Sequence, residues 1–242
     1  MNKTYNITSS DALLITDVQN DFLPGGALPI QEGDEIIPVL NEYASVFSDA
    51  KANVFASKDW HPPNHCSFKQ QGGSWPPHCV QDTKGAEFSP GLKLPEDTVV
   101  VFKATDPMRE SYSVFDGTTF AKELKERGIQ RLFIGGLATD YCVLKTAQDA
   151  RKHGYETVVL MDATQGINAK PGDVDKAIKS MLECGAAQAT TADFPDAVDK
   201  LPIGESEADT FENKPEERAD VKRKARMRPR GTSKRIQTEN KK

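Results

Sequence analysis

Residues 131–142 read RLFIGGLATDYC, an apolar run followed by two glycines and a polar turn. The run from Arg131 to Ile134 is short and rich in branched and aromatic side chains, which is typical of a buried strand. From Asp140 to His153 the apolar residues recur every three or four positions, and Gly154 follows as a helix stop. The stretch therefore predicts a strand that turns directly into a helix.

The same alternation of short apolar runs and helical patterns fills most of the chain. The predicted strands are Ala12 to Thr16, Asn53 to Ala56, Thr98 to Phe102, Arg131 to Ile134, Thr157 to Met161 and Ala187 to Thr191. The predicted helices are Asp34 to Ser48, Thr118 to Arg127, Asp140 to His153 and Asp173 to Cys184. Strands that alternate with helices favour a three-layer α/β fold, a mostly parallel six-stranded sheet with helices on both faces.

Composition divides the chain into a domain and a tail. The apolar content falls after about Leu201, so we expect one domain over residues 1–202 and a disordered, charged tail over residues 203–242. The net charge of −5 hides this division: from Lys214 onward 12 Lys and Arg residues face 4 Asp and Glu residues, which gives +8 and leaves −13 for the rest. Domain and tail are therefore expected to have different partners.

The N-terminal residues predict a soluble protein of the cytoplasm. Met1 to Asp11 are largely polar, and the apolar run from Ala12 to Ile15 is too short for a signal peptide or a membrane span. The four cysteines are spread widely through the 242 residues, unlike those of a disulfide framework. We therefore expect reduced thiols, one of which could be reactive.

Three reactive side chains lie near the predicted carboxyl ends of strands, where ligands bind in sheets of this kind. Asp17 follows the first strand, Lys103 follows the third, and Cys142 lies in the turn after the fourth. The N–H groups and dipole of a helix start would favour a Cys142 thiolate and, with Gly135 and Gly136 nearby, could hold an oxyanion. Lys103 could keep Asp17 charged while Asp17 takes the thiol proton. The alternatives are an inert buried cysteine and a structural ion pair, or a capping role for Asp17.

A second chemical group lies at the start of the segment from Trp60 to Leu94, which is long for an idle connection. Asp59 and His61 are followed by His65 and His78. A carboxylate and imidazoles suit Zn²⁺ or another first-row divalent metal, and three protein ligands would leave open positions for a substrate. The alternative is a surface loop that happens to contain histidines.

Five motifs carry a family resemblance. They are Asp17-Val18-Gln19-Asn20-Asp21-Phe22 with Pro24-Gly25-Gly26, Ser57-Lys58-Asp59-Trp60-His61-Pro62, Trp75-Pro76-Pro77-His78-Cys79, Val101-Phe102-Lys103 and Gly135-Gly136-Leu137-Ala138-Thr139-Asp140-Tyr141-Cys142-Val143. Over nearly all of Ala12 to Leu201 the chain thereby resembles the nicotinamidases (pyrazinamidases) of the isochorismatase-like cysteine hydrolases. The resemblance implies the isochorismatase-like hydrolase fold and hydrolysis of nicotinamide to nicotinate and ammonia through a cysteine thioester, a step of NAD salvage.

The resemblance also implies roles for individual residues. The implied catalytic triad is Asp17, Lys103 and Cys142. The implied metal ligands are Asp59, His61 and His78. The implied cofactor is one divalent transition metal, Zn in the first place and Fe or Mn otherwise. His65 matches a residue that in relatives ligates the metal directly or through water.

Other implied roles concern the substrate. Phe22 and Trp75 match residues that flank the ring, and Tyr112 matches another pocket residue. The resemblance also implies a cis peptide bond between Leu137 and Ala138, which would place Leu137 at the substrate site. The N–H groups of Ala138 and Cys142 would hold the oxyanion.

Two other hypotheses remain. An isochorismatase or a carbamoyl amidohydrolase of the same superfamily would share the fold, Asp17 and Lys103, although Cys142 and Asp59-x-His61 argue against an isochorismatase. Alternatively, the basic tail could contact nucleic acid, an acidic partner or an import receptor, and so allow nuclear entry. Its basic residues include Lys222, Arg223, Lys224, Arg226, Arg228 and Arg230. A homo-oligomer is also compatible with the sequence.

Overall fold

The computed structural model describes residues 4–195, which contain one parallel six-stranded sheet. Its strands are β1 (Asp11–Thr16), β2 (Asn53–Asp59), β3 (Val99–Lys103), β4 (Arg131–Leu137), β5 (Glu156–Gln165) and β6 (Ala187–Ala189). They lie in the order β3-β2-β1-β4-β5-β6, and each neighbouring pair is parallel. The connections from β1 and β4 therefore diverge, which leaves room for a site beyond their carboxyl ends.

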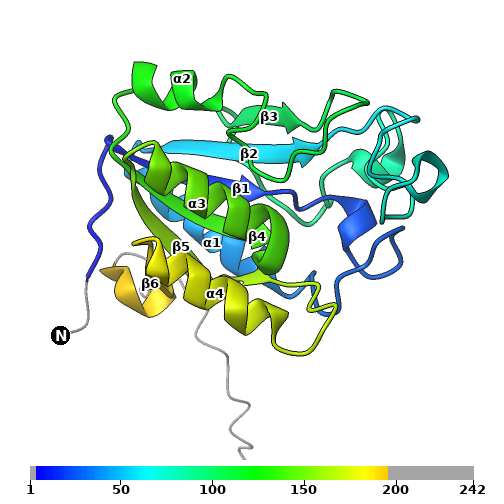
Figure 1. The fold of residues 1–242 in the computed structure, drawn as a ribbon. Helices are drawn as coiled ribbons and strands as arrows, with labels where there is room; N and C mark the ends of the chain where they lie inside the picture. Colours follow the sequence, from blue (N-terminus) through cyan, green and yellow to red (C-terminus); the bar gives the residue numbers. More distant parts are fainter. Residues whose placement is uncertain (1–3, 196–242) are drawn as a thin grey trace, which may run out of the picture. The chain divides into compact units, whose positions relative to one another are not determined.

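Helices cover both faces of this sheet, as predicted (Figure 1). Helix α1 (Ile36–Asp49) packs on one face. Helices α2 (Phe120–Glu126), α3 (Leu144–Lys152) and α4 (Asp173–Glu183) contribute to the hydrophobic cluster on the other. The predicted three-layer α/β architecture is confirmed.

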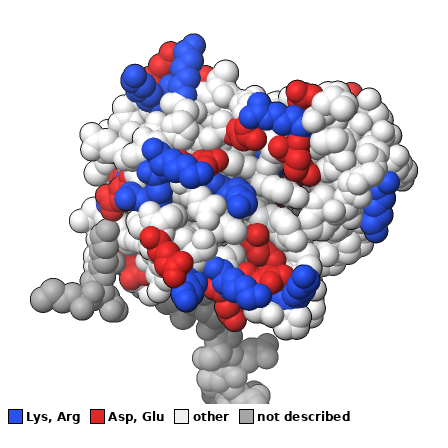
Figure 2. All heavy atoms as spheres, in the orientation of Figure 1, with Lys and Arg blue, Asp and Glu red and all other residues white. Residues whose placement is uncertain are grey.

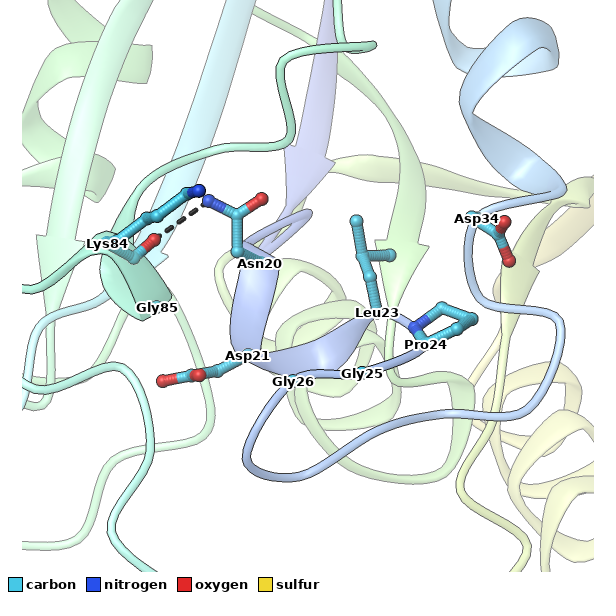
Figure 3. A pocket seen from close by; sticks show the side chains of 9 residues that line it. All are labelled: Asn20, Asp21, Leu23, Pro24, Gly25, Gly26, Asp34, Lys84 and Gly85. Carbon is cyan, nitrogen blue, oxygen red and sulfur yellow. Dashed lines mark hydrogen bonds between the residues drawn. The ribbon is translucent and has the colours of Figure 1, made fainter. Parts of the chain in front are cut away.

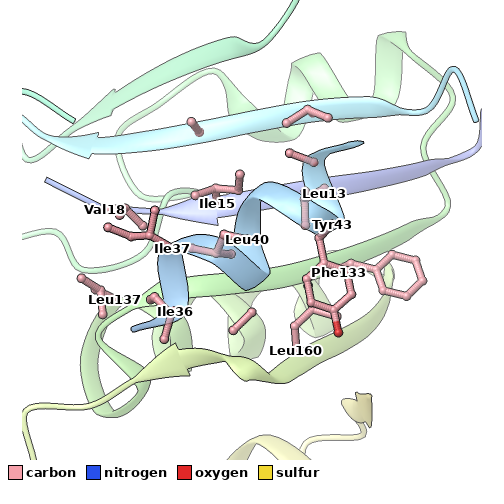
Figure 4. Close-up of a cluster of buried hydrophobic side chains, with 14 of the residues drawn as sticks. Leu13, Ile15, Val18, Ile36, Ile37, Leu40, Tyr43, Phe133, Leu137 and Leu160 are labelled. Carbon is pink, nitrogen blue, oxygen red and sulfur yellow. The ribbon is translucent and has the colours of Figure 1, made fainter. Parts of the chain in front are cut away.

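Strand β1 shows how the sequence builds this core. Leu13 and Ile15 belong to the hydrophobic cluster that includes Leu40 of α1 (Figure 4), whereas Ala12 and Leu14 belong to the cluster on the opposite face. All five residues are fully buried. Side chains alternate between the faces of a strand, and a parallel strand covered on both faces is apolar throughout.

The carboxyl ends of several strands extend beyond their predicted limits. β2 continues to Asp59, which pairs in register with Lys103, the last residue of β3. β5 continues to Gln165, which pairs with Leu137 of β4. The apolar pattern stops before these strands do, because their last residues are polar. Ser57 and Asp59 bond within the site, and Gln165 donates to the Gln31 carbonyl.

The predicted helix Asp140 to His153 begins later than expected. Residues Thr139–Val143 form a π-helical turn, and α3 begins only at Leu144. The wide turn closes on Ala138, whose carbonyl accepts the N–H of Val143 at 3.1 Å. Single π-turns of this kind occur often at functional sites.

The described residues cover most of the predicted domain but none of the predicted tail. The tail, residues 203–242, lies outside the described residues, so its boundary at residue 202 stays a prediction. Among residues 4–195, none of the helices has the length and apolar character that crossing a bilayer requires.

Candidate active site

Four adjacent strands bring the predicted reactive side chains together. Asp17 directly follows β1, Asp59 and Lys103 end β2 and β3, and Cys142 lies in the π-turn after β4. The strand order β3-β2-β1-β4 places these ends side by side at one edge of the sheet. All four residues are at least 95% buried, with relative exposures between 0% and 5%. The parallel topology thus creates a buried cluster of two carboxylates, an ammonium and a thiol.

Lys103 is the centre of this cluster. Its Nζ lies 2.5 Å from Asp59 Oδ1, 3.0 Å from Asp17 Oδ2 and 3.4 Å from Cys142 Sγ. Burial by itself would lower the pKa of Lys103, but Asp17 and Asp59 outweigh it and raise the pKa well above its usual value. The lysine therefore stays charged and stabilises two carboxylates that would otherwise be unpaired in the interior.

Asp17 is held in a geometry suited to proton transfer. It adopts the left-handed region with φ of 50°, and its N–H bonds to the carbonyl of Ser57 at 3.2 Å. The Ser57 hydroxyl donates to Oδ1 at 2.7 Å, whereas Oδ2 accepts no well-aligned hydrogen bond and is paired ionically with Lys103. Burial raises the pKa of Asp17 to about 6, against the lowering effect of Lys103. At neutral pH the carboxylate is ionised but ready to accept a proton.

Burial opposes ionisation of the Cys142 thiol in the free protein. A carboxylate oxygen of Asp17 lies within 4.8 Å of its Sγ. Burial raises the pKa of Cys142 well above its usual value, and Lys103 only partly opposes this effect. The prediction that the helix start would favour a resting thiolate is therefore wrong, because the loss of hydration outweighs it. A base is required, and Asp17 is in place to act as one.

Asp59, His61 and His78 form a second cluster against the first. All three are buried, and one potential ligand atom from each lies within 4.8 Å of the others. His61 Nδ1 lies 3.0 Å from the His78 carbonyl, and His78 Nδ1 lies 2.8 Å from the Pro76 carbonyl. A carbonyl only accepts, so each Nδ1 carries a hydrogen, and Nε2 is the ring nitrogen left for a metal. Burial lowers the pKa of His61 to about 4, which keeps the ring neutral.

This donor set suits a divalent transition metal. Two neutral imidazoles and a carboxylate are a common ligand combination for zinc and its first-row neighbours. The pKa of Asp59 is lowered despite burial, because Lys103, His61 and His78 favour its ionised form. Asp59 contacts the ammonium through Oδ1, so it connects the metal cluster to the Lys103 cluster.

Gln19 fixes the backbone of this shared aspartate. Its Oε1 accepts the Asp59 N–H at 2.8 Å, and its Nε2 donates to the Asp59 carbonyl at 2.7 Å and the Ala86 carbonyl at 3.0 Å. Gln19 is fully buried. The sequence analysis assigned Gln19 no role. Its side chain makes hydrogen bonds to the Asp59 backbone of the kind that a neighbouring strand makes, and such contacts have no signature in the local sequence.

His65 lies beside the cluster but has both ring nitrogens engaged. Its ring centroid is 4.4 Å from that of His61. Nδ1 lies 2.7 Å from Ser67 Oγ and accepts the Ser67 N–H at 3.3 Å, so Nε2 carries the hydrogen and faces the Arg109 carbonyl at 3.1 Å. Direct ligation by His65 would require this last bond to break.

A narrow cavity of about 20 Å³ opens between the two clusters. It is lined by Phe22, Leu28, Asp59, Trp75, His78, Tyr112, Ala138, Tyr141, Cys142 and Ile167. The Trp75 indole donates to the Tyr112 hydroxyl at 3.0 Å, and its ring meets Tyr141 edge-on at 5.1 Å between centroids. The space holds about one water molecule, so a flat aromatic ligand has to displace some of these side chains to enter.

Most residues predicted to contact the substrate line this cavity, but Leu137 does not. Its side chain is fully buried in the cluster around α1 (Figure 4). The reason is the alternation along β4, which turns Leu137 toward the core. The peptide bond from Leu137 to Ala138 is cis, as the resemblance implied. The predicted contribution of Leu137 is therefore limited to this bond.

Three cavity residues were missed by the sequence analysis: Leu28, Tyr141 and Ile167. Tyr141 immediately precedes the cysteine, and Ile167 lies just beyond the carboxyl end of β5. The rule that ligands bind at carboxyl ends of strands could have indicated Ile167. Leu28 gives no such signal, since it reaches the cavity through an irregular loop.

Comparison with known proteins agrees with this geometry. The isochorismatase domain matches residues 11–193. The chain belongs to the isochorismatase family. This isochorismatase-family protein is 38% identical over 204 residues to the nicotinamidase of Escherichia coli (strain K12), covering 76% of this chain and 96% of the relative.

Solved structures show the same relationship. The pyrazinamidase of Pyrococcus horikoshii in complex with zinc is 50% identical to the isochorismatase-family protein, with a TM-score of 0.72 over 75% of this chain and 99% of the other. PnC1 from L. infantum in complex with nicotinate is 34% identical, with a TM-score of 0.73 over 79% and 98% of the two chains. The isochorismatase-like hydrolase fold is thereby confirmed.

Proposed function

We propose that this protein is a nicotinamidase, an amidohydrolase that converts nicotinamide and water into nicotinate and ammonia in NAD salvage. The observation that carries the proposal is the position of Lys103 Nζ, 3.0 Å from Asp17 and 3.4 Å from Cys142, beside the cluster of Asp59, His61 and His78. The nicotinamidase of Escherichia coli and the nicotinate complex of the L. infantum protein support the choice of substrate.

Binding uses the cavity between the two clusters. Phe22, Trp75 and Tyr112 would contact the pyridine ring, since all three line the cavity. Asp59, His61 and His78 would hold one divalent metal, with zinc favoured by the zinc complex of the Pyrococcus horikoshii relative and Fe or Mn as alternatives. A metal bound there supplies a Lewis acid for the ring nitrogen and so orients the carboxamide.

Acylation begins with Asp17. Its carboxylate accepts the proton of Cys142, and the sulfur attacks the carboxamide carbon. The carbonyl electron pair moves to oxygen, where the N–H groups of Ala138 and Cys142 hold the oxyanion. When the C–N bond breaks, Asp17 returns the proton to the leaving nitrogen, which departs as ammonia. Lys103 stays protonated throughout and offsets the charge that develops on its neighbours.

Deacylation uses the same carboxylate again. Asp17 takes a proton from water, the resulting hydroxide attacks the thioester carbon, and the C–S bond breaks to release nicotinic acid, which loses its proton to solvent as nicotinate. The proton returns to the sulfur of Cys142. A pKa of about 6 suits Asp17 for both directions of transfer, because the carboxyl gains and loses a proton readily near neutral pH.

The direct test is ammonia release from nicotinamide by the full chain. We expect turnover that stops after chelation and returns when zinc is added. A carbamoyl amide or isochorismate, assayed in parallel, tests the other superfamily activities. Hydrolysis of a carbamoyl amide without any hydrolysis of nicotinamide would replace the proposal with that alternative.

The basic tail supports a second, separate proposal. On the face seen in Figure 2, basic and acidic side chains alternate over α3 and α4, and Lys152–Asp149 and Lys176–Asp173 form ion pairs there. The segment from Lys222 to Arg230 instead holds six basic residues and no acidic one. We propose that residues 203–242 contact nucleic acid, with an acidic protein or an import receptor as the other candidates.

Three measurements test the role of the tail, the location of the protein and its oligomeric state. We expect salt-sensitive nucleic-acid binding by the full chain that is lost on removal of residues 214–242, and unchanged binding would contradict it. The enzyme is proposed to be cytoplasmic, with nuclear entry through the tail, and imaging of the tagged full chain and the truncated chain tests both statements. A homo-oligomer is compatible with the sequence, and light scattering of the full chain tests for one.

A further inference from the structure

A carboxylate outside both clusters holds the backbone next to a metal-site histidine. Asp21 Oδ2 accepts the N–H of Cys79 at 2.7 Å, and Oδ1 accepts the N–H of Ala27 at 3.2 Å. Cys79 directly follows His78, is fully buried and has a left-handed φ of 45°. A non-glycine residue keeps this conformation only where its surroundings enforce it, and a buried N–H needs an acceptor. Asp21 meets both needs.

The neighbours of Asp21 bind the same loop. Gln19 donates to the carbonyl of Ala86 at 3.0 Å, and Asn20 donates to the carbonyl of Lys84 at 2.8 Å (Figure 3). The segment after β1 therefore contacts the Lys84–Ala86 turn through consecutive side chains. This fixes the position from which Asp21 reaches Cys79.

Gly85 makes room for the carboxylate. A Cβ atom added at Gly85 would lie between 2.1 and 2.4 Å from the carboxylate atoms of Asp21. Figure 3 shows Asp21 beside the turn that carries Gly85. Any side chain at this position would push the carboxylate away from Cys79 and Ala27.

We propose that Asp21 is a positioning residue of the metal site. It acts through the Cys79 N–H and orients His78 toward Asp59 and His61. Gly85 leaves the space that the carboxylate of Asp21 occupies. The proposal rests on the metal site of the proposed function and extends it. Asp21 is neither among the residues that line the cavity nor in the cluster of potential metal ligands. Its effect is on the geometry of His78, and hence on how tightly the site binds zinc. Residues that orient metal ligands in this way typically change affinity by about 10- to 100-fold when replaced.

Two variants perturb the contact in different ways. In Asp21→Asn the side chain keeps its shape, but one amide oxygen cannot serve both N–H groups and the amide nitrogen faces a donor. In Gly85→Ala the charge of Asp21 is kept and its carboxylate is displaced. Asp34→Asn is the control, because Asp34 is exposed and lines the same open cleft as Asp21 and Gly85.

The experiment measures zinc affinity by competition with a chromophoric chelator, together with thermal unfolding of the metal-free proteins and kcat at saturating zinc. We expect about 10- to 100-fold weaker zinc binding for Asp21→Asn and Gly85→Ala, wild-type affinity for Asp34→Asn, and recovery of kcat when zinc is saturating. If Asp21→Asn does not fold, Gly85→Ala alone decides the question.

Each contrary outcome has a definite meaning. Wild-type affinity in both Asp21→Asn and Gly85→Ala would overturn the proposal, and so would equal losses in Asp34→Asn. Zinc binding by the wild-type protein without nicotinamide hydrolysis would remove the proposed function but leave the role of Asp21 intact. A wild-type protein that binds no zinc would overturn both.

Discussion

The two clusters of the active site meet in one cavity but are held by different kinds of structure. Asp17 follows β1 and Lys103 ends β3, and both strands pair with β2, so the pairing of the sheet sets their positions. His61 and His78 lie in the long connection between β2 and β3, where hydrogen bonds from Nδ1 to backbone carbonyls set theirs. Changes at the strand ends should therefore affect the chemical step and stability, whereas changes in the loop should affect metal and substrate binding.

The largest effect is expected at the nucleophile. Cys142→Ala removes the sulfur that forms the thioester, and losing a nucleophile of this kind lowers kcat by about 10⁴-fold or more. Zinc content should stay at the wild-type level, because Cys142 is not among the proposed ligands. Ammonia release and elemental analysis measure both quantities. Cys184→Ala, on a partly exposed cysteine at the end of α4, is the control and should be fully active.

Replacing Lys103 tests whether the charges of Asp17, Asp59 and Lys103 stabilise one another. Lys103→Met leaves the carboxylates of Asp17 and Asp59 buried without their shared cation, which should lower the free energy of unfolding by about 3–5 kcal/mol and abolish turnover. Denaturant unfolding measures the change. Lys152→Met, on an exposed side chain of α3, should change stability by less than about 0.5 kcal/mol. Equal stability of the two variants would show that the buried pairing contributes little.

Changes to the histidines of the metal cluster should lower the affinity for the metal. His78→Ala removes one of three proposed ligands, so zinc affinity should fall more than the 10- to 100-fold typical of residues that only orient a ligand. KM for nicotinamide should rise, while circular dichroism should show an unchanged fold. His153→Ala is the matched control, since His153 stacks on Phe115 away from the cavity. Wild-type zinc affinity in His78→Ala would remove this histidine from the site.

The pH dependence separates the base from its surroundings. Asp17 has to be ionised to accept the thiol proton, so kcat/KM should fall as pH drops below about 6, by about tenfold at one pH unit below the pKa. The Ser57 hydroxyl stabilises the ionised form and lowers this pKa. Ser57→Ala should therefore move the acidic inflection to higher pH. A profile that stays flat down to pH 5 would exclude Asp17 as the base.

The smallest effect is expected in the aromatic wall. Tyr112→Phe keeps the ring but removes the oxygen that accepts the Trp75 indole N–H at 3.0 Å. Loss of such a bond typically corresponds to about 0.5–1.5 kcal/mol, which amounts to a several-fold rise in KM. Steady-state kinetics with nicotinamide measure it, and kcat should be nearly unchanged. A large fall in kcat with constant KM would mean that Tyr112 takes part in the chemical step.

The same comparison explains what could be predicted from the sequence. Asp17, Lys103 and Cys142 were found because apolar runs mark strands, and the ends of parallel strands meet at one edge. The order of strands and helices followed from the same pattern. Strand lengths did not, because the last residues of β2 and β5 are polar and pair only with other strand ends.

Interactions between distant segments account for what was missed. The direction of Leu137 depends on the pairing of β4, and the protonated state of Cys142 depends on burial that only the assembled fold creates. Gln19 and Asp21 lie two and four positions after Asp17, yet their roles require partners about forty to seventy positions away. No local periodicity reports such contacts.

In the proposed mechanism Cys142 forms a covalent intermediate with the carboxamide carbon of the substrate. This step is tested most directly by quenching the zinc-loaded enzyme with acid during turnover of nicotinamide and mapping its peptides by mass spectrometry. We expect a nicotinoyl group on Cys142 in the wild-type protein and none at this position in Cys142→Ala. Steady turnover with an unmodified Cys142, or with the nicotinoyl group on another residue, would contradict it.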